Sequence, residues 1–396
     1  MKFSGENKLL IWCPYQMKAD KWDKFSIPLL CKKMLADFKK EGVHAIIPIA
    51  KTHKEKLQAD YFSDLGDGPG SFDFIDVDVS YVNGVLHIHD FKELQKRTDF
   101  KVVLNTEPFQ SRALKTALAK PAAFFNPEMV NYVLFSPDED LFSKEEKYNV
   151  VLSLLMNKAV FNGPASMAQS LAVARSVFSP SLIKDSVEKN WVKNSLGINC
   201  GKIDGLKVMS DNPPYTDGVV RFLYGGRLSH HKHIEDTIDV VKYLHESGMK
   251  VEYTIQTYGQ NSCKKLEGWA NQYPFIKPLY NVPQLEFYKN AQRHDIFICA
   301  SRTETYGLSF FEMLYSGMVG IFYKQPWQNG IVPKDYPLIA ENKNQMMAMA
   351  KDVAGNVSEW QNKLEGLRTW IFQNENSSTK NSELLAKLES WAEVAK

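Results

Sequence analysis

The sequence predicts an α/β protein of two domains, each built on a mostly parallel sheet that is doubly wound with helices. Short apolar runs rich in branched and aromatic residues alternate with longer amphipathic stretches, which is typical of parallel strands joined by crossover helices. The chain has 396 residues, 44% of them hydrophobic, and this length exceeds what a single hydrophobic core normally serves. Two doubly wound domains therefore fit the pattern better than one barrel.

Apolar runs in the first half of the chain predict five strands, and an amphipathic stretch between the first two predicts a helix. The expected strands are residues 9–13, 44–50, 101–105, 158–162 and 176–180. In the stretch 27–40, apolar residues recur near helical spacing. These residues are Leu29, Leu30, Met34, Leu35 and Phe38.

The second half repeats this alternation of strand and helix. Strands are expected at 219–226, 251–259 and 294–301, and helices at 233–247 and near 308–317. Between the halves, KVMSDNPPYTDG (207–218) has the proline, aspartate and glycine content of an interdomain linker. We therefore expect one domain at 1–206 and a second at 207–375.

The last residues, 376–396, are expected to form a C-terminal helix with one strongly apolar face. That face comprises Leu384, Leu385, Leu388, Trp391 and Val394. A helix with so apolar a face must dock on another part of the chain, because leaving the face in water is unfavourable.

Composition and charge exclude several classes of protein. Lysine and arginine number 48 against 46 aspartates and glutamates, a net charge of +2, so the chain as a whole is neither a polycation nor an acidic solvating chain. Its five cysteines are scattered without a C-x-x-C pair, which argues against a disulfide framework or zinc ribbon. The N-terminus turns polar too soon for a signal peptide, and the apolar stretch Met313–Tyr323 is too short to span a bilayer. We expect a soluble, cytoplasmic protein.

The segment Phe297–Gly317 reads as a buried strand, a polar loop and a helix that begins near Leu308. A helix N-terminus after a strand offers free backbone N–H groups and a partial positive charge, which suit an anionic ligand. Glu304 lies in the loop and Glu312 on the second turn of the helix, so these carboxylates are expected to address two parts of one ligand. A capping carboxylate and a solvated helix residue are the alternative interpretation.

A second segment, FLYGGRLSHHKHI (222–234), also reads as a strand, a turn and a helix. Gly225 and Gly226 let the backbone turn tightly, so that Arg227 and Lys232 project into the crevice where open α/β sheets bind ligands. Arginine binds phosphate bidentately and lysine acts as a mobile point charge, so these cations suit a diphosphate. A solvated basic turn is the alternative, and the neighbouring histidines have no paired ligands for zinc.

Together, the two segments resemble a known family. The order G-G-R-L-x-x-x-K (225–232), a strand ending near Gly259, and E-x7-E (304–312) with Y-G-L inside it resembles the donor-binding half of GT-B glycosyltransferases, particularly glycosyltransferase family 4. The resemblance covers roughly residues 219–325. It implies a GT-B architecture, in which two Rossmann-like domains face each other across a cleft and a C-terminal helix packs back on the N-terminal domain.

The resemblance also implies roles for individual residues. Arg227 and Lys232 would neutralise the diphosphate of a nucleotide sugar. Glu304 would bind hydroxyls of the transferred sugar and Glu312 the ribose. The remaining donor-binding residues lie in the glycine turn, in the loop of the glutamate motif and in the segment KPLYNVP (277–283), which looks like the loop that receives the base. They are Gly226, Thr305, Tyr306, Gly307, Leu308, Tyr280, Asn281 and Val282.

The sequence departs from the family pattern in both halves. In the second half, Thr305 and Tyr280 replace glycines, and Gly-Met-Val (317–319) replaces a Gly-x-Pro. In the first half, CPYQMKADKW (13–22) stands where a glycine-rich loop often follows the first strand. No residue clearly matches the histidine that faces the reacting sugar. Glu107 is its stand-in, and His87 and His89 are rivals that fit a structural role better.

The implied activity is transfer of a sugar from a nucleotide-diphosphate sugar to an acceptor hydroxyl, with retention of anomeric configuration and without a metal or other cofactor. The alternative is a catalytically silent GT-B relative that binds a nucleotide sugar or stabilises a partner. An NAD-dependent oxidoreductase is disfavoured because no G-x-G-x-x-G follows a strand. Asp76-Val-Asp78 matches the metal-binding D-x-D of the other glycosyltransferase architecture, but so short a pattern is common by chance.

The uneven charge of the first hundred residues bears on the acceptor. Residues 1–56 contain 12 lysines and 6 acids, whereas residues 60–99 contain 9 acids and 3 basic residues. A surface that contacts phosphates and stacks bases interleaves aromatic and basic residues, as do Trp12, Tyr15, Lys18, Lys21, Trp22, Lys24 and Phe25. A solvated lysine face beside core aromatics is the simpler interpretation. Three acceptor classes stay open: DNA with a hydroxymethylated base, a lipid-linked or cell-surface glycan at an anionic membrane, and a small metabolite.

Overall fold

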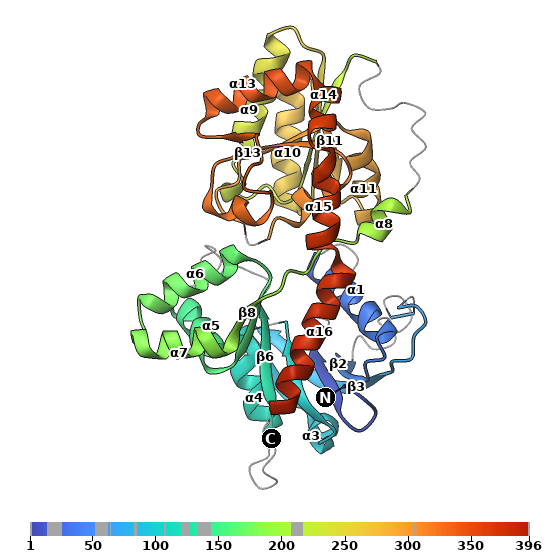
Figure 1. Cartoon of the computed structure of the whole chain (residues 1–396), viewed down its shortest axis with the longest axis vertical. Helices are drawn as coiled ribbons and strands as arrows, with labels where there is room; N and C mark the ends of the chain where they lie inside the picture. Colours follow the sequence, from blue (N-terminus) through green and yellow to red (C-terminus); the bar gives the residue numbers. More distant parts are fainter. Residues whose placement is uncertain are drawn as a thin grey trace. The chain divides into compact units, whose positions relative to one another are not determined.

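The computed structural model of the chain describes residues 2–13, 26–51, 62–63, 65–82, 85–106, 108–119, 127–133, 144–206, 217–304 and 306–394. The chain forms two compact units (Figure 1), the first made of Met1–Leu196 with Ser377–Lys396 and the second of Gly197–Asn376. The chain therefore first passes from one unit to the other between residues 196 and 197, whereas the boundary predicted from the sequence lies between residues 206 and 207. Helix α8 (Cys200–Asp204) belongs to the second unit, because the Tyr315 hydroxyl donates to Asp204 at 2.8 Å.

The first unit is built on an eight-stranded sheet with the order β4-β3-β2-β1-β5-β6-β7-β8. All neighbouring strands run parallel except β3 and β4, which are antiparallel. The strands are β1 (Lys8–Trp12), β2 (Ala45–Ala50), β3 (Phe72–Val82), β4 (Val85–Asp90), β5 (Phe100–Asn105), β6 (Glu128–Val133), β7 (Lys158–Phe161) and β8 (Trp191–Lys193). Four of the five strands predicted for this half correspond to β1, β2, β5 and β7.

The fifth predicted strand, 176–180, is wrong. These residues form the turn between α6 (Pro164–Arg175) and α7 (Pro180–Asn190). Ser179 is the N-cap of α7, its hydroxyl accepts the Leu182 N–H at 3.4 Å, and Pro180 follows at the first helical position. Proline at that position is already set for a helix, so the two residues start α7 rather than extend a strand.

The remaining helices of the first unit cover the sheet. They are α1 (Ser26–Lys40), α3 (Lys92–Lys96), the 3₁₀ turn η5 (Pro108–Gln110), α4 (Ser111–Leu118), α5 (Lys144–Met156) and α16 (Ser377–Val394). Of the helices in the described ranges, none combines the length and the apolarity that crossing a bilayer requires.

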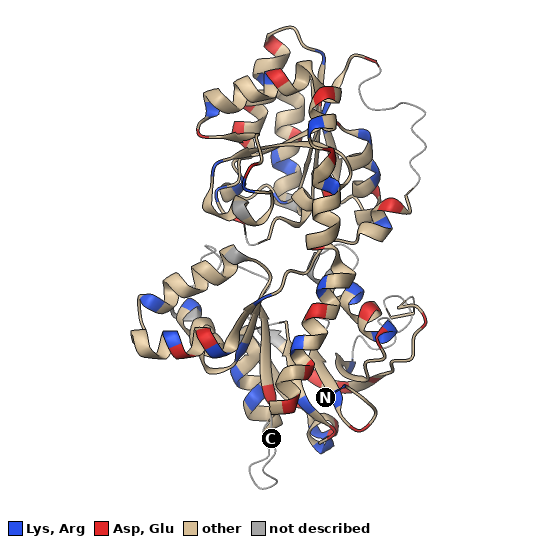
Figure 2. Ribbon diagram, in the orientation of Figure 1, with Lys and Arg blue, Asp and Glu red and all other residues tan. Residues whose placement is uncertain are grey.

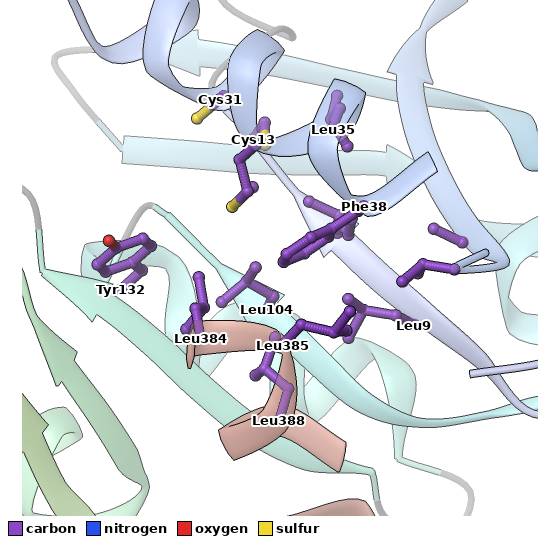
Figure 3. Close-up of a cluster of buried hydrophobic side chains, with 14 of the residues drawn as sticks. Leu9, Cys13, Cys31, Leu35, Phe38, Leu104, Tyr132, Leu384, Leu385 and Leu388 are labelled. Carbon is purple, nitrogen blue, oxygen red and sulfur yellow. The ribbon is translucent and has the colours of Figure 1, made fainter. Parts of the chain in front are cut away.

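Helix α16 returns from the far end of the sequence to complete the core of the first unit. Figure 3 shows Leu384, Leu385 and Leu388 directed toward Phe38 of α1 and Leu104 of β5. Leu384 and Leu388 are at most 1% exposed. Polar contacts fix the same helix, since the Asn381 amide donates to Asp37 at 2.7 Å and the Asn194 amide to the Lys380 carbonyl at 3.0 Å. Val394, predicted on the apolar face, is instead 77% exposed at the helix end.

Some lysines of the lysine-rich N-terminal region contact acidic or carbonyl groups within the first unit. Lys8 pairs with Asp73 at 2.6 Å and with Asp99 at 3.3 Å, and Lys39 donates to the Gly66 carbonyl at 2.7 Å. Figure 2 shows charged residues of both signs interspersed over the helices of each unit. These lysines are therefore used inside the first unit.

The predicted base-stacking surface is only partly described by the structure. Trp12, the first of its aromatic residues, is fully buried and packs against Phe91 with ring centroids 5.6 Å apart. It therefore belongs to the core and not to a stacking surface, which corrects the prediction at that position. The other members, Tyr15, Lys18, Lys21, Trp22, Lys24 and Phe25, lie outside the described residues.

The second unit is built on a six-stranded parallel sheet with the order β11-β10-β9-β12-β13-β14. Its strands are β9 (Val220–Gly225), β10 (Val251–Thr257), β11 (Ile276–Tyr280), β12 (Ile296–Cys299), β13 (Val319–Tyr323) and β14 (Ile339–Ala340). The direction of winding reverses between β9 and β12. In open α/β sheets, the crevice outside the carboxyl ends of the strands at such a reversal is where ligands bind.

Helices pack on both sides of this sheet in the pattern expected for a doubly wound domain. They are η7 (His230–Lys232), α9 (Ile234–Glu246), α10 (Gln260–Gln272), α11 (Gln284–Arg293), α12 (Leu308–Tyr315), η8 (Pro326–Gly330), α13 (Lys343–Gly355), α14 (Val357–Lys363) and α15 (Glu365–Glu375). The helices predicted at 233–247 and near 308–317 correspond to α9 and α12.

Asp295, immediately before β12, is a buried carboxyl that limits the stability of the second unit. It is 0% exposed, and its Oδ2 accepts the Arg221 N–H at 2.8 Å. Burial raises its pKa from 3.8 to about 6, although the hydrogen bond and the charge of Arg221 act in the opposite direction. A carboxyl that binds its proton more tightly in the folded chain destabilises the fold progressively as the pH rises between these two values.

Asp295→Asn is therefore expected to stabilise the second unit at alkaline pH, since an asparagine oxygen still accepts the Arg221 N–H. From the two pKa values, the gain in unfolding free energy is about 3 kcal/mol at pH 8 and about half of that at pH 5. Urea denaturation of both proteins at the two pH values measures the gain. A gain that is equal at pH 5 and pH 8, or a loss at both, would contradict this expectation.

Candidate functional site

The glycine turn after β9 is held in one conformation by its neighbours. A Cβ atom on Gly225 would lie 2.4 Å from a ring carbon of Phe287, so no larger residue fits there without movement. The Gly226 N–H donates to the Gln256 carbonyl at 3.1 Å, and the Tyr224 hydroxyl donates to the Arg227 carbonyl at 2.7 Å. The turn thereby carries the chain from the end of the central strand into η7.

Lys232 and Glu304, which are 72 residues apart in the sequence, form an ion pair at the carboxyl edge of the sheet. The Lys232 side chain is 19% exposed and that of Glu304 is 8% exposed. The Arg302 N–H donates to the His231 carbonyl at 2.9 Å, so the backbones of the two segments are also joined. The fold therefore brings together the two motifs that the sequence placed on separate strands.

Unlike Lys232, Arg227 forms no ion pair within the described part of the chain. Its side chain is exposed, and its guanidinium makes neither a hydrogen bond nor an ion pair with the residues that the structure describes. An exposed cation beside a glycine turn at the end of a parallel strand is placed to meet an anionic group.

Gly307, the N-cap of helix α12, has a backbone conformation that favours glycine. Its φ is +75°, and a Cβ atom there would lie 2.4 Å from Cδ1 of Ile331. Among the described residues, no side chain caps the first turn of α12, so backbone N–H groups near Leu308 are placed to bind an anion. Tyr306, just before the helix, is buried, and its hydroxyl donates to Glu375 at 2.8 Å.

Glu312 is a buried carboxyl on the second turn of α12, 4% exposed, rather than a solvated helix residue. Its Oε1 accepts hydrogen bonds from the Tyr288 hydroxyl at 2.7 Å and from the Gln284 amide at 3.4 Å. Burial raises the pKa of Glu312 to about 7, although the hydrogen bonds to Tyr288 and Gln284 favour the charged form. Its protonation is thus balanced near neutral pH.

The predicted base-receiving segment begins as a strand and ends as a tight turn. Residues 277–280 belong to β11, and the Asn281 N–H donates to the Thr257 carbonyl at 2.9 Å. Asn281 has a φ of +52°, a left-handed conformation that asparagine tolerates better than most residues. Tyr280 is 41% exposed and Val282 is half-buried, so an aromatic face is presented beside the turn.

Several residues that were not predicted contribute to this edge of the sheet. Tyr288 and Gln284 of α11 hold Glu312, and Tyr224 holds the Arg227 carbonyl. Gln256 and Thr257 end β10, are at most 5% exposed, and have a side-chain amide and a hydroxyl without a hydrogen-bond partner in the described part of the chain. In the sequence, the one indication that these two residues belong to this edge is their position at the carboxyl end of a central strand.

The other predicted residues lie in the first unit or outside the described residues. Asp76 and Asp78 lie on β3, and His87 and His89 lie on β4, both in the first unit, where Ser80 Oγ and His89 Nε2 are 2.7 Å apart. Glu107 and Thr305 lie outside the described residues. Across the described ranges, no group of three His, Cys, Asp or Glu side chains is arranged to hold a metal ion.

Comparison of the sequence with known families gives a match within the second unit. Residues 213–363 match the family described as "Glycosyl transferases group 1", and this range contains Arg227, Lys232, Glu304 and Glu312. No curated protein matches the sequence.

Comparison with solved structures places the whole chain in one fold. Alr3699/HepE from Anabaena, in complex with UDP and glucose, matches with a TM-score of 0.67 at 11% identity, over 97% of this chain and 100% of that chain. Sucrose-phosphate synthase from Thermosynechococcus elongatus matches with a TM-score of 0.67 at 11% identity, over 99% of this chain and 100% of that chain. A glycosyltransferase from Rickettsia africae matches with a TM-score of 0.63 at 14% identity, over 97% of this chain and 99% of that chain.

These matches span nearly the full length of both chains, and the sequence family covers the unit in which the two motifs meet. The chain therefore has the GT-B fold, and its second unit contains a region that matches the group 1 glycosyl transferases.

Proposed function

We propose that the chain transfers a sugar from a nucleotide-diphosphate sugar to an acceptor hydroxyl with retention of anomeric configuration, using Arg227, Lys232, Glu304 and Glu312 in its second unit. The observation that carries this proposal is the Lys232–Glu304 ion pair beside the open N-terminus of α12. The pair joins the two motifs that the family resemblance assigns to the diphosphate and to the transferred sugar.

The chemical difficulty of the reaction is the negative charge that builds on the departing diphosphate as the anomeric carbon becomes oxocarbenium-like. Arg227, Lys232 and the backbone N–H groups that follow Gly307 supply positive potential where that charge grows. Groups that are already oriented before the reaction need no reorganisation in the transition state, which makes them effective. Arg227 contributes a charge that the described residues leave unpaired.

Glu304 binds hydroxyls of the transferred sugar in this proposal. A carboxylate accepts hydrogen bonds from two hydroxyl groups at once, so it orients a sugar ring as well as binding it. Lys232 forms an ion pair with this carboxylate, and the pair holds Glu304 in position for the sugar.

The leaving phosphate helps to deprotonate the acceptor hydroxyl, which is the retaining outcome that the family resemblance implies. The acceptor binds to the first unit, with Glu107 as the candidate residue near the reacting sugar. A glycan, a small metabolite and a hydroxymethylated base in DNA are the acceptor classes to test. The internal pairing of Lys8 and Lys39 and the burial of Trp12 weaken the support for DNA and leave the first two classes favoured.

The test incubates the protein with UDP-glucose, UDP-N-acetylglucosamine, GDP-mannose and ADP-glucose, each with glycan, metabolite and DNA acceptors. UDP sugars come first because Alr3699/HepE binds UDP-glucose. A sugar mass increment on an acceptor is expected by mass spectrometry, and proton NMR of the product reports its anomeric configuration. Release of nucleotide without acceptor measures hydrolysis. A product of inverted configuration would overturn retention, and no nucleotide release from any donor would overturn the proposal.

Donor binding without turnover would instead support the catalytically silent alternative. The feature that favours this alternative is the segment 13–22, which lacks the glycine-rich loop often found after the first strand. Calorimetric titration with the same four nucleotide sugars separates binding from turnover.

A further inference from the structure

Glu312 is the residue on which the inference rests, because its two carboxylate oxygens have different surroundings. Oε1 accepts from both Tyr288 and Gln284, at 2.7 and 3.4 Å. No hydrogen bond from the described residues reaches Oε2. Tyr288 is itself 1% exposed, and burial raises the pKa of its hydroxyl well above the usual value. The tyrosine hydroxyl therefore stays protonated and serves as a fixed donor to Oε1.

The charged and titratable groups around Glu312 do little to offset the effect of burial on its pKa. Among the described cations, Lys202 of α8 lowers the pKa of Glu312, and it does so less than the two hydrogen bonds do. Elsewhere on α8, Asp204 is paired with Arg368 of α15, and Cys200 has a pKa of about 11 and stays a thiol. The remaining charges on α11 and α15 include the exposed pair of Lys289 with Glu286, and Glu375, which accepts from Tyr306. Strand β13, VGIFY, carries no charge.

We propose that Tyr288 is a positioning residue that holds Glu312 as a hydrogen-bond acceptor for the donor, so that donor affinity rises with pH across neutrality and depends on the Tyr288 hydroxyl. The inference rests on the proposed role of Glu312 in binding the ribose. A carboxylate accepts from a ribose hydroxyl at Oε2, whereas the protonated acid presents a hydroxyl of its own there. Only the ionised form therefore binds the ribose well.

The direction and size of the effect follow from linkage. With a pKa of about 7, the ionised fraction of Glu312 falls about tenfold from pH 8 to pH 6. The apparent Kd for the donor rises by the same factor, because affinity scales with the competent fraction. Removing the Tyr288 hydroxyl removes a hydrogen bond that favours the charged form, so the midpoint of the profile moves to higher pH, by about one unit for a typical buried hydrogen bond.

The experiment measures Kd by calorimetry between pH 5.5 and pH 9 for UDP-glucose, GDP-mannose and ADP-glucose. Nucleotide sugars are used because a free terminal phosphate titrates near pH 6 and would add its own pH dependence. Wild type is compared with Tyr288→Phe, for which a raised midpoint is expected, and with Glu312→Gln, for which a flat profile is expected. Tyr253→Phe is the matched control, since it also loses a buried hydroxyl, which lies 2.7 Å from that of Thr237.

The outcomes separate this inference from the function on which it rests. Absence of binding by all three nucleotide sugars at every pH would overturn both. Binding with a midpoint that Tyr288→Phe leaves at the wild-type pH would overturn the inference alone, as would a pH-dependent profile retained by Glu312→Gln. A raised midpoint in Tyr288→Phe together with an unshifted one in Tyr253→Phe supports the positioning role, because a general loss of packing would affect both variants. If Tyr288→Phe does not fold, a pH-dependent profile retained by Glu312→Gln still overturns the inference.

Discussion

Lys232→Ala is expected to lower kcat by about 100–1000-fold with the donor that the panel identifies. Removing one preorganised positive group from a site where negative charge develops typically has an effect of this size. The substitution also leaves Glu304, which is 8% exposed, without its ion pair, so donor affinity is expected to fall as well. Steady-state kinetics over a range of donor concentrations separates the loss in kcat from the rise in KM.

Lys242→Ala is the matched control for this prediction. Lys242 lies on α9 in the same unit, is 43% exposed and contacts Glu246 at 3.7 Å, which is a surface pair of small energetic value. Its removal is expected to leave kcat and KM unchanged. A kcat for Lys232→Ala within threefold of wild type would remove Lys232 from the proposed mechanism, whatever the behaviour of the other charged residues.

The second large effect is expected at Leu388 of α16, in the core of the first unit. Leu388 is 0% exposed and packs among side chains of α1 and the central strands. Leu388→Ala is expected to lower the unfolding free energy of the first unit by about 2–5 kcal/mol, through lost burial and the cavity left behind. Urea denaturation measures this loss, and the unfolding of the two units is to be fitted separately if it does not coincide.

Leu152→Ala provides the comparison for this loss. Leu152 lies on α5 of the same unit but is 39% exposed, so truncating it is expected to change stability by no more than about 0.5 kcal/mol. A loss for Leu388→Ala as small as the one expected for Leu152→Ala would contradict the role of α16 in completing the core.

The elements that were predicted correctly are those whose signals are local. The turn after β9 needs glycine because the Phe287 ring leaves no room for a side chain at Gly225, and Gly307, the N-cap of α12, has a positive φ. Both requirements are visible as glycines next to apolar runs. The motif residues Arg227, Lys232 and Glu304 therefore stood out in the sequence before their contacts were known.

The elements that were missed depend on contacts between distant residues. Tyr288 is an ordinary aromatic residue of an amphipathic helix, and only packing of α11 beside α12 brings it to Glu312. Residues 176–180 contain apolar and branched side chains, yet Ser179 and Pro180 start a helix there. The burial of Trp12 follows from the position of β1 at the centre of an eight-stranded sheet, an order that no local pattern reveals.

Helix α16 also determines the order in which the chain is able to fold while it is being synthesised. The first unit lacks this helix until the second unit, about 180 residues long, has been made. At about 5–20 residues per second, that delay is roughly 10–40 s. During this interval the apolar side chains that α16 covers, Phe38 and Leu104 among them, are exposed to water and to chaperones. The second unit is contiguous in sequence, so on the ribosome it is able to complete its core before the unit whose strands emerge first.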